Sequence, residues 1–299
     1  MLRSFAEIRE AALARGPRRL AVAGAADVDV LEGLARAAGL GLVSPVAVGP
    51  REGLATAAGN AGVDLSAWTV VEEEDPGEVP LVAAGLVRSG AADILIKGST
   101  STAAFMRAVL DEDRGLRGAG LMSHVFVTEA RRLGRLLLVT DGGINIAPSL
   151  EEKAGIVRNA LPLARALGID EPRVAVLAAV EKVNPRMPET EDAARLVEMN
   201  AAGDLCGCTV AGPYAVDNAV WPGAAEKKGL TGPVAGRADV ILVPSVLVGN
   251  TFCKGITYIA GESCGGYVAG ARAPVVFLSR ADDVETRVNS MALGVLMSA

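Results

Sequence analysis

Short apolar runs alternate with helical patterns along most of the chain. The first run, residues 19–24, is followed by a helical pattern at 27–38 and a second apolar run at 42–48. The same order recurs up to a final apolar run at 275–278 and a final helical pattern at 282–296. Alternation of this kind predicts parallel sheets covered by helices on both faces. Such sheets bind ligands beyond the carboxyl ends of their strands, where loops and helix N-termini meet.

Small polar loops follow three of the predicted strands. The apolar run at 240–243 is stopped by Pro244, and Gly249 and Asn250 precede the helical pattern that carries Lys254. The two other loops of this plan are residues 97–102 and 279–283. A helix that begins in such a loop offers unpaired N–H groups and the positive end of its dipole to an anion. The three strand ends therefore predict a group of donors suited to an anionic small molecule.

Composition excludes several classes of partner. The 299 residues suggest one large or two medium domains. Aromatic residues make up 3% of the chain and the net charge is −6, so no surface for nucleic acid is predicted. The spacing of the four cysteines does not resemble a zinc site, and we expect no metal. The longest uncharged run, residues 240–253, is too short to span a bilayer, and residues 1–15 do not resemble a signal peptide. We therefore expect a cytoplasmic protein without a membrane partner.

The loop at residues 97–102 is a candidate for phosphate binding. Lys97, Gly98 and four hydroxyl residues stand at the start of a helical pattern, which suits a phosphate group. The glycine and lysine order of a P-loop is absent, however, and a Ser or Thr at a helix start is ordinarily an N-cap. A dinucleotide fingerprint is also absent after the first strand, where Gly24 is the only glycine in residues 21–26.

Three further positions are candidates for contact with a ligand, although a purely structural role is also open for them. His124, the only histidine, lies beside Ser123 in an apolar run, where a hydrogen-bonded structural role fits as well as contact with a ligand. Asn184 lies in a loop with two prolines at residues 181–190. Asp217 lies where a predicted strand gives way to a helix, a position at which carboxylates more often cap the helix than act as bases.

Taken in order, these motifs resemble those of the phosphate acetyltransferase and phosphate butyryltransferase family, and are nearer to the butyryltransferase branch. The likeness runs from about residue 93 to the C-terminus, whereas the first ninety residues carry only the general α/β pattern. The segments that carry it are residues 96–98, 123–124, 139–142, 145–148, 181–188, 212–219, 238–244, 249–250, 254 and 279–282. Singly most of these motifs are weak, but as an ordered set they are specific.

The resemblance implies an α/β fold of two domains. Each would be a three-layer sandwich with a parallel sheet, similar to the isocitrate dehydrogenase-like fold, and the active site would lie in the interdomain cleft. We place residues 1–132 and 274–299 in the first domain and residues 133–273 in the second. The resemblance also implies a homodimer or a larger homo-oligomer.

The implied activity is that of a phosphate acyltransferase, which converts an acyl-CoA and inorganic phosphate into an acyl phosphate and CoA. The acyl group would be short, with butyryl the first choice and acetyl the second, and transfer would be direct within a ternary complex. CoA is a substrate, and no tightly bound cofactor is implied. Two alternatives remain at this stage: a protein that binds CoA or acyl phosphate without turnover, and an oxidoreductase of the isocitrate dehydrogenase-like fold.

The family's Ser-Arg pair corresponds to Ser279 and Arg280. The arginine would bind the phosphate or phosphoryl group, and the serine would assist at the thiol or the carbonyl. An acidic base is proposed in acetyltransferases just beyond this pair; Asp282 is near that place, but Thr286 also fits it, so the base stays open. The predicted catalytic residues are therefore Ser279, Arg280, Asp282 and Asn250. The predicted substrate-binding residues are Lys97, Gly98, Ser99, Thr102, Ser123, His124, Asn184, Asp217, Gly249 and Lys254.

Overall fold

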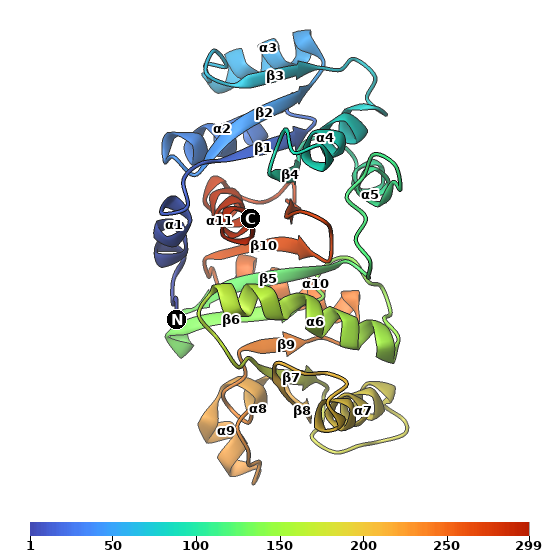
Figure 1. Cartoon of the computed structure of the whole chain (residues 1–299). Helices are drawn as coiled ribbons and strands as arrows, with labels where there is room; N and C mark the ends of the chain where they lie inside the picture. Colours follow the sequence, from blue (N-terminus) through green and yellow to red (C-terminus); the bar gives the residue numbers. More distant parts are fainter. Residues whose placement is uncertain (299) are drawn as a thin grey trace. The chain divides into compact units, whose positions relative to one another are not determined.

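The structure is a computed structural model that describes residues 1–298, and the chain divides into two compact units (Figure 1). Unit 1 consists of Met1–Ser4 and Leu121–Cys264, and unit 2 of Phe5–Gly120 and Gly265–Ala299. These boundaries differ from the ones expected at 132/133 and 273/274. The charged residues near position 132 form the turn of an antiparallel hairpin, so the strands before and after them stay in the same unit.

Unit 2 contains a mostly parallel sheet with the strand order β3-β2-β1-β4-β11-β10. Neighbouring strands pair in parallel except β10 and β11, which pair antiparallel. The strands are β1 (Arg18–Ala23), β2 (Val43–Gly49), β3 (Thr69–Glu72), β4 (Ile94–Lys97), β10 (Cys264–Ala269) and β11 (Val275–Val276). Strand β10 was not predicted, because two glycines at its start conceal the apolar pattern of a strand.

The helices of unit 2 follow their strands as the alternation predicts. They are α1 (Phe5–Leu13), α2 (Val28–Gly39), α3 (Arg51–Ala61), α4 (Val79–Arg88), α5 (Thr102–Leu110) and α11 (Val284–Met297). Helix α11 packs on α1 and α2, while α4 packs on β1 and β2. The N-cap of α2 is Asp27, whose carboxylate accepts the backbone N–H of Val30 at 3.1 Å, and Ser101 caps α5 in the same way.

Unit 1 has a five-stranded arrangement in the order β5-β6-β9-β7-β8. Strands β5 and β6 form the antiparallel hairpin, and the remaining neighbours are parallel. The strands are β5 (Ser123–Ala130), β6 (Arg135–Thr140), β7 (Arg173–Leu177), β8 (Thr209–Tyr214) and β9 (Val240–Leu242). The helices are α6 (Leu150–Ala166), α7 (Pro188–Ala202), α8 (Val216–Val220), α9 (Pro222–Lys227) and α10 (Val246–Lys254), with short helical turns η1 (Arg131–Leu133) and η2 (Gly255–Ile259).

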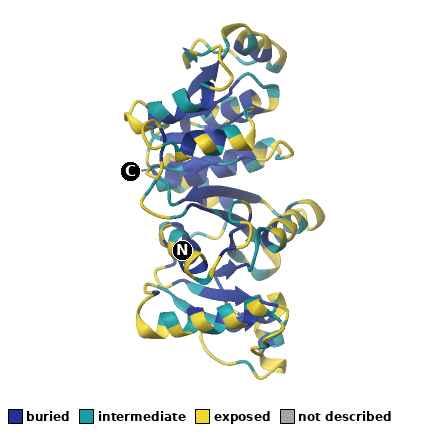
Figure 2. Ribbon diagram, turned by 90° about the vertical axis from the view of Figure 1, so that its right-hand side faces the viewer, coloured by how far each residue is buried: buried dark blue, intermediate teal, exposed yellow. Residues whose placement is uncertain are grey.

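Most strands are buried within their unit, and most exposed residues lie on helices and loops (Figure 2), although the edge strand β3 is largely exposed. Strand β4 is buried along its whole length, down to the charged Lys97 at its carboxyl end. Asp239, directly before β9, is also buried, and Arg173 donates two side-chain hydrogen bonds of 2.8 Å to it. Paired charges are tolerated in such places, whereas an unpaired charge requires another explanation.

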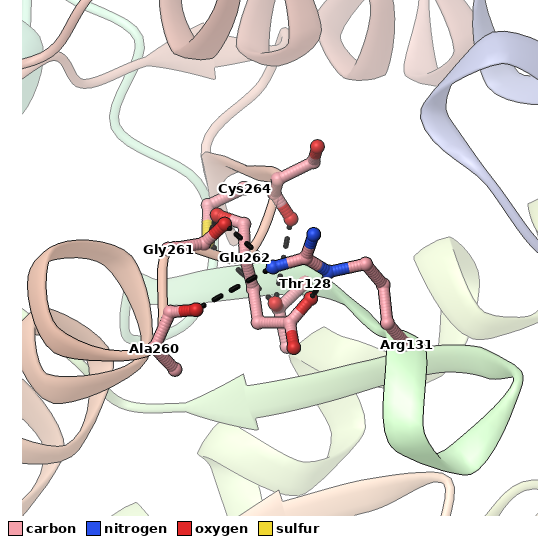
Figure 3. A network of polar contacts seen from close by, with 7 residues as sticks. Thr128, Arg131, Ala260, Gly261, Glu262 and Cys264 are labelled. Atoms are coloured by element: carbon pink, nitrogen blue, oxygen red, sulfur yellow. Dashed lines mark hydrogen bonds and ion pairs between the residues drawn. The ribbon is translucent and has the colours of Figure 1, made fainter.

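A polar network fixes the end of the β5–β6 hairpin to the segment that follows η2 (Figure 3). The guanidinium of Arg131 donates to the carboxylate of Glu262 at 2.7 Å and to the carbonyl of Gly261 at 3.0 Å. Next to it, Thr128 donates its hydroxyl to the carbonyl of Ser263 at 3.3 Å. These contacts give a structural role to the charged residues at the turn of the hairpin.

Candidate functional site

The carboxyl ends of β1 and β4 in unit 2 are held together by main-chain hydrogen bonds. Gly98 donates its N–H to the carbonyl of Ala23 at 3.0 Å, and Ser99 donates its N–H to the carbonyl of Gly24 at 2.8 Å. A Cβ atom on Gly98 would lie 2.0 Å from the carbonyl oxygen of Gly24. Only glycine fits at this approach, and the approach fixes the main chain directly after Lys97.

The hydroxyl groups of this loop largely stabilise its own structure. The hydroxyl of Ser99 donates to the carbonyl of Gly24 at 3.0 Å, and that of Thr100 donates to the carbonyl of Ala23 at 3.3 Å. Ser101 is the N-cap of α5, and Thr102 is the exposed first residue of that helix. The N-cap alternative is therefore correct for Ser101.

The Ser279–Arg280 turn follows β11 in the same unit and is closed by Asp282. The carboxylate of Asp282 accepts the N–H of Ser279 at 2.7 Å, and the hydroxyl of Ser279 accepts the N–H of Ala281 at 3.3 Å. Both Ser279 and Arg280 are exposed. Asp283 is the N-cap of α11, where its carboxylate accepts the N–H of Thr286 at 2.7 Å.

These two loops line one cavity of about 310 Å³ in unit 2. Its lining residues are Asp27, Asp29, Val30, Lys97, Gly98, Ser99, Leu278, Ser279, Arg280 and Arg287. Five residues predicted for the site thus come together: Lys97, Gly98, Ser99, Ser279 and Arg280. Leu278 and Val30 add apolar surface beside the charged groups, a mixture common in ligand sites.

Arg287, on α11, is a lining residue that the sequence analysis missed. It is only 4% exposed, and its guanidinium donates to the carbonyl of Asp282 at 3.0 Å and to that of Arg280 at 3.4 Å. It therefore supports the Ser279–Arg280 turn from beneath. The sequence gives no clear signal for it, because a charged residue in a helical pattern is ordinarily exposed.

The cavity is electropositive, because two of its cations are buried without a carboxylate partner. Neither Lys97 nor Arg287 forms an ion pair within the described part of the chain, and the ammonium of Lys97 donates to the carbonyl of Gly98 at 3.2 Å. Burial lowers the pKa of Lys97, the positive charges of Arg280 and Arg287 lower it further, and Asp27 opposes them. An anion in this cavity would relieve the repulsion among the cations and replace their lost hydration.

In unit 1, Asp141 organises the loop after β6. It is buried, and its carboxylate accepts the N–H groups of Gly143, Ile144 and Asn145 at 2.8 to 3.0 Å. The N–H of His124 also donates to it, at 3.2 Å. These four bonds make Asp141 the fixed centre of the loop.

His124 and Ser123 lie on β5 beside that loop. The Nδ1 atom of His124 is buried and has no hydrogen-bond partner within residues 1–298, and burial lowers the pKa of His124 although Asp141 opposes the shift. The buried hydroxyl of Ser123 accepts the side-chain amide of Asn159 on α6 at 3.0 Å. This bond gives Ser123 a structural contact within unit 1.

The prediction of a loop at Gly249 and Asn250 is wrong, because both residues lie inside α10. The helix begins at Val246, almost directly after β9, so its N-terminus lies at Ser245. A Cβ atom on Gly249 would lie 2.4 Å from the carbonyl oxygen of Asp141, which explains the glycine by close packing. Asn250 and Lys254 are exposed, and the Lys254 ammonium lies 5.5 Å from the ring centroid of Tyr258.

The two remaining predicted residues also lie in unit 1. The side-chain oxygen of Asn184 accepts the N–H of Arg186 at 3.0 Å, which makes it part of a turn. Asp217 is exposed on α8 and lines a second cavity with Trp221 and Lys228. Within the described residues, no group of three or more His, Cys, Asp or Glu side chains is placed to hold a metal ion. Among the described helices, none is long and apolar enough to cross a membrane.

The family model described as "Phosphate acetyl/butaryl transferase" matches residues 76–295. The chain belongs to this family. It is 42% identical over 298 residues to the phosphate butyryltransferase of Clostridium acetobutylicum, covering 100% of this chain and 99% of that protein. It is 39% identical over 289 residues to the phosphate acetyltransferase of Rhizobium meliloti, covering 97% and 92% respectively.

A solved structure of the family agrees with the fold. The branched-chain phosphotransacylase from Enterococcus faecalis V583 superimposes with a TM-score of 0.83 at 30% identity, covering 94% of this chain and 100% of that one. The predicted family and the α/β fold class are thereby confirmed. The sheets are mixed rather than wholly parallel, because β5–β6 and β10–β11 pair antiparallel.

Proposed function

We propose that this member of the family is a phosphate acyltransferase that moves a short-chain acyl group between CoA and inorganic phosphate. Relatives named phosphate butyryltransferase and phosphate acetyltransferase, both aligned over nearly the whole chain, support this reaction. Two phosphate butyryltransferases match at 42% identity, which favours butyryl over acetyl as the acyl group. The substrates would be acyl-CoA, phosphate and acyl phosphate, with CoA as a substrate rather than a bound cofactor.

The observation that carries the proposal is the cationic cavity of unit 2. Lys97, Arg280 and Arg287 line it together, and two of the three are almost fully buried. Burial of a charge without a partner is costly, so the two buried cations favour an anionic ligand. Phosphate and acyl phosphate both carry negative charge that can pair with these cations.

Arg280, Arg287 and Ser279 contribute to binding in different ways. The exposed guanidinium of Arg280 offers a planar pair of donors that matches two oxygens of a phosphate group. Arg287 already donates to two carbonyls of the turn, so it acts mainly by its charge and by holding Arg280 in place. The hydroxyl of Ser279 accepts one main-chain bond and keeps its proton for donation to a carbonyl oxygen.

Acyl transfer follows from these contacts without an acylated enzyme. A phosphate oxygen held by Arg280 attacks the thioester carbonyl, and the carbonyl oxygen becomes an oxyanion that Ser279 and the cations stabilise. The intermediate collapses when the C–S bond breaks and CoA leaves as a thiolate. The location of the active site between two domains, the homo-oligomeric assembly and the cytoplasmic location stay predictions.

The first experiment measures CoA release from acetyl-, propionyl- and butyryl-CoA with and without inorganic phosphate, by following free thiol. Phosphate-dependent release with butyryl-CoA as the best substrate supports the proposal. Release without phosphate indicates a thioesterase. No release from any substrate favours the protein that binds CoA or acyl phosphate without turnover.

Arg280→Ala tests the site itself. The change should raise the phosphate KM by about 10- to 100-fold or abolish turnover, since a hydrogen bond to a charged group contributes roughly 1.5–3 kcal/mol. The matched control is Arg36→Ala on the exposed side of α2, which removes an arginine of the same unit outside the cavity. Unchanged kinetics in Arg280→Ala would remove Arg280 from the site.

A further inference from the structure

We propose that Lys97 is the group that accepts the thiol proton of CoA when an acyl phosphate is the substrate, and that returns this proton in the opposite direction. The inference rests on the proposed function and assigns the proton transfer that the family's acidic base would otherwise perform. The group that Lys97 would contact is the thiol of CoA, which would lie at the carboxyl end of β4.

The geometry around Lys97 leaves its ammonium available for this role. Lys97 is 5% exposed, lines the cavity, and donates only to the neighbouring carbonyl of Gly98 within the described chain. Because this bond goes to a main-chain oxygen, no carboxylate holds the proton on Lys97. The main chain at Gly98 packs so closely against Gly24 that no side chain fits there, and this packing also holds Lys97 at the end of β4.

The charged groups that face Lys97 come from three parts of unit 2. Arg280 approaches from the turn after β11, Arg287 from α11, and Asp27 and Asp29 from the start of α2. Burial and the two arginines lower the pKa of Lys97, while Asp27 opposes the shift, and the Phe277 ring, whose centroid lies 6.0 Å from the ammonium, favours the charged form as well. Arginine stays charged at any pH of interest, so phosphate remains bound by Arg280 while Lys97 loses its proton.

Three carboxylates near the site, those of Asp27, Asp282 and Asp283, already have other partners. Asp27 caps α2 through the N–H of Val30, and Asp283 caps α11 through the N–H of Thr286. Asp282 closes the Ser279–Arg280 turn. Thr286, which fits the place of the family's acidic residue, has an alcohol that cannot serve as a base near neutral pH.

The step balances in both directions. With acyl phosphate and CoA as substrates, the neutral Lys97 amine takes the thiol proton and becomes an ammonium. The thiolate forms the C–S bond with the acyl carbon, and the C–O bond to phosphate breaks with its electron pair leaving on phosphate. In the opposite direction the C–S bond breaks, and the ammonium of Lys97 gives its proton to the departing thiolate.

Lys97→Arg separates proton transfer from anion binding. Arginine keeps the positive charge and cannot release a proton, so kcat for CoA and acyl phosphate should fall by about 10²- to 10⁴-fold while the KM for acyl phosphate changes little. The matched control is Lys153→Arg, a second buried lysine, which is ion-paired with Asp192 in unit 1. That control should retain its turnover. Full turnover in Lys97→Arg, with the wild type active, overturns the inference and leaves the proposed function standing.

Lys97→Ala with added primary amines gives a test that a purely structural or anion-binding lysine would not pass. Ethylamine or propylamine should restore turnover in proportion to the concentration of the uncharged amine as pH is varied. Restoration in proportion to the ammonium ion instead would show that Lys97 only supplies charge. The absence of any phosphate-dependent turnover in the wild type would instead refute the proposed function, and the inference with it.

A measurement on the wild type alone covers the case in which Lys97 variants do not fold. The rate with saturating CoA and acyl phosphate should rise with pH, since the neutral amine is the active form. The apparent pKa of that rise should shift strongly downward on warming, because amine ionisation absorbs much heat. A temperature-independent apparent pKa would indicate a carboxylate, of which Asp29 is the exposed candidate in the cavity, and would overturn the assignment.

Discussion

Gly98→Ala is the smallest change that should disrupt the cationic cavity. The new methyl carbon would lie 2.0 Å from the carbonyl oxygen of Gly24 and 2.9 Å from that of Ala23. Both obstacles are main-chain atoms, so no side chain can rotate away to make room. Relief of the first contact even to 3.0 Å requires the ends of β1 and β4 to separate by about 1 Å.

Such a separation acts on three hydrogen bonds between the loops. These are the N–H bonds from Gly98 to Ala23 and from Ser99 to Gly24, and the hydroxyl bond from Ser99 to Gly24. At roughly 0.5–1.5 kcal/mol for each net bond, their loss lowers the free energy of unfolding by about 1.5–4.5 kcal/mol. The same shift moves Lys97 and should reduce kcat about 10²-fold, since displacements near 1 Å at a reacting centre have effects of that size.

Urea denaturation and steady-state kinetics measure the two effects. Gly85→Ala, within α4 of the same unit, is the matched control: its Cβ meets nothing within 4 Å, so the change should raise the free energy of unfolding by about 0.5–1 kcal/mol and leave kcat unchanged. If Gly98→Ala instead behaves like Gly85→Ala, the close approach of β1 and β4 does not determine the site.

Three further outcomes are expected. Asp239→Asn should lower the free energy of unfolding by about 1.5–3 kcal/mol in urea denaturation, because the partly buried guanidinium groups around it lose their counter-charge. Titration with a thiol reagent at pH 8 should detect the exposed Cys206 quickly and Cys253 only after denaturation, since burial raises the pKa of Cys253 to about 12. In phosphate-free buffer, the free energy of unfolding should rise with pH between the lowered pKa of Lys97 in the folded protein and its ordinary pKa of 10.5. The reason is that the unfolded chain binds more protons than the folded one in this range. Lys97→Met should flatten this slope.

The strand ends were the part of the site that the sequence predicted best. A buried apolar run followed by small polar residues places those residues at the carboxyl end of a strand, and residues 97–99 and 279–280 do lie there together. Two of the three predicted loops lie together because neighbouring parallel strands share one edge for their carboxyl ends, whereas the loop expected near Gly249 belongs to unit 1. This part of the prediction needed no knowledge of side-chain contacts.

The local sequence pattern predicts the wrong structure where close packing determines which residue is present. Gly249 was interpreted as a loop residue, yet it lies within α10, where a Cβ would meet the carbonyl of Asp141. Periodicity does not reveal which glycine permits such an approach, because the contact joins residues distant in sequence. Arg287 was missed for a related reason: a charged residue in an amphipathic helix is ordinarily exposed, and only the fold shows that this one is buried.

The ambiguity over the base also has a physical origin. The sequence places three acidic residues within six positions of Ser279, and each is a plausible base when only spacing is known. In the structure Asp283 is the cap of α11 and Asp282 closes the turn, while Glu285 forms an ion pair with Arg9 at 2.6 Å. Each of these carboxylates thus has a structural contact, which suits fixing a turn more than accepting a thiol proton. Lys97 differs from them, because it is buried, its ammonium bonds only to a main-chain carbonyl within the described residues, and burial and two arginines lower its pKa. We therefore place the proton transfer at the end of β4 rather than in the turn that follows β11.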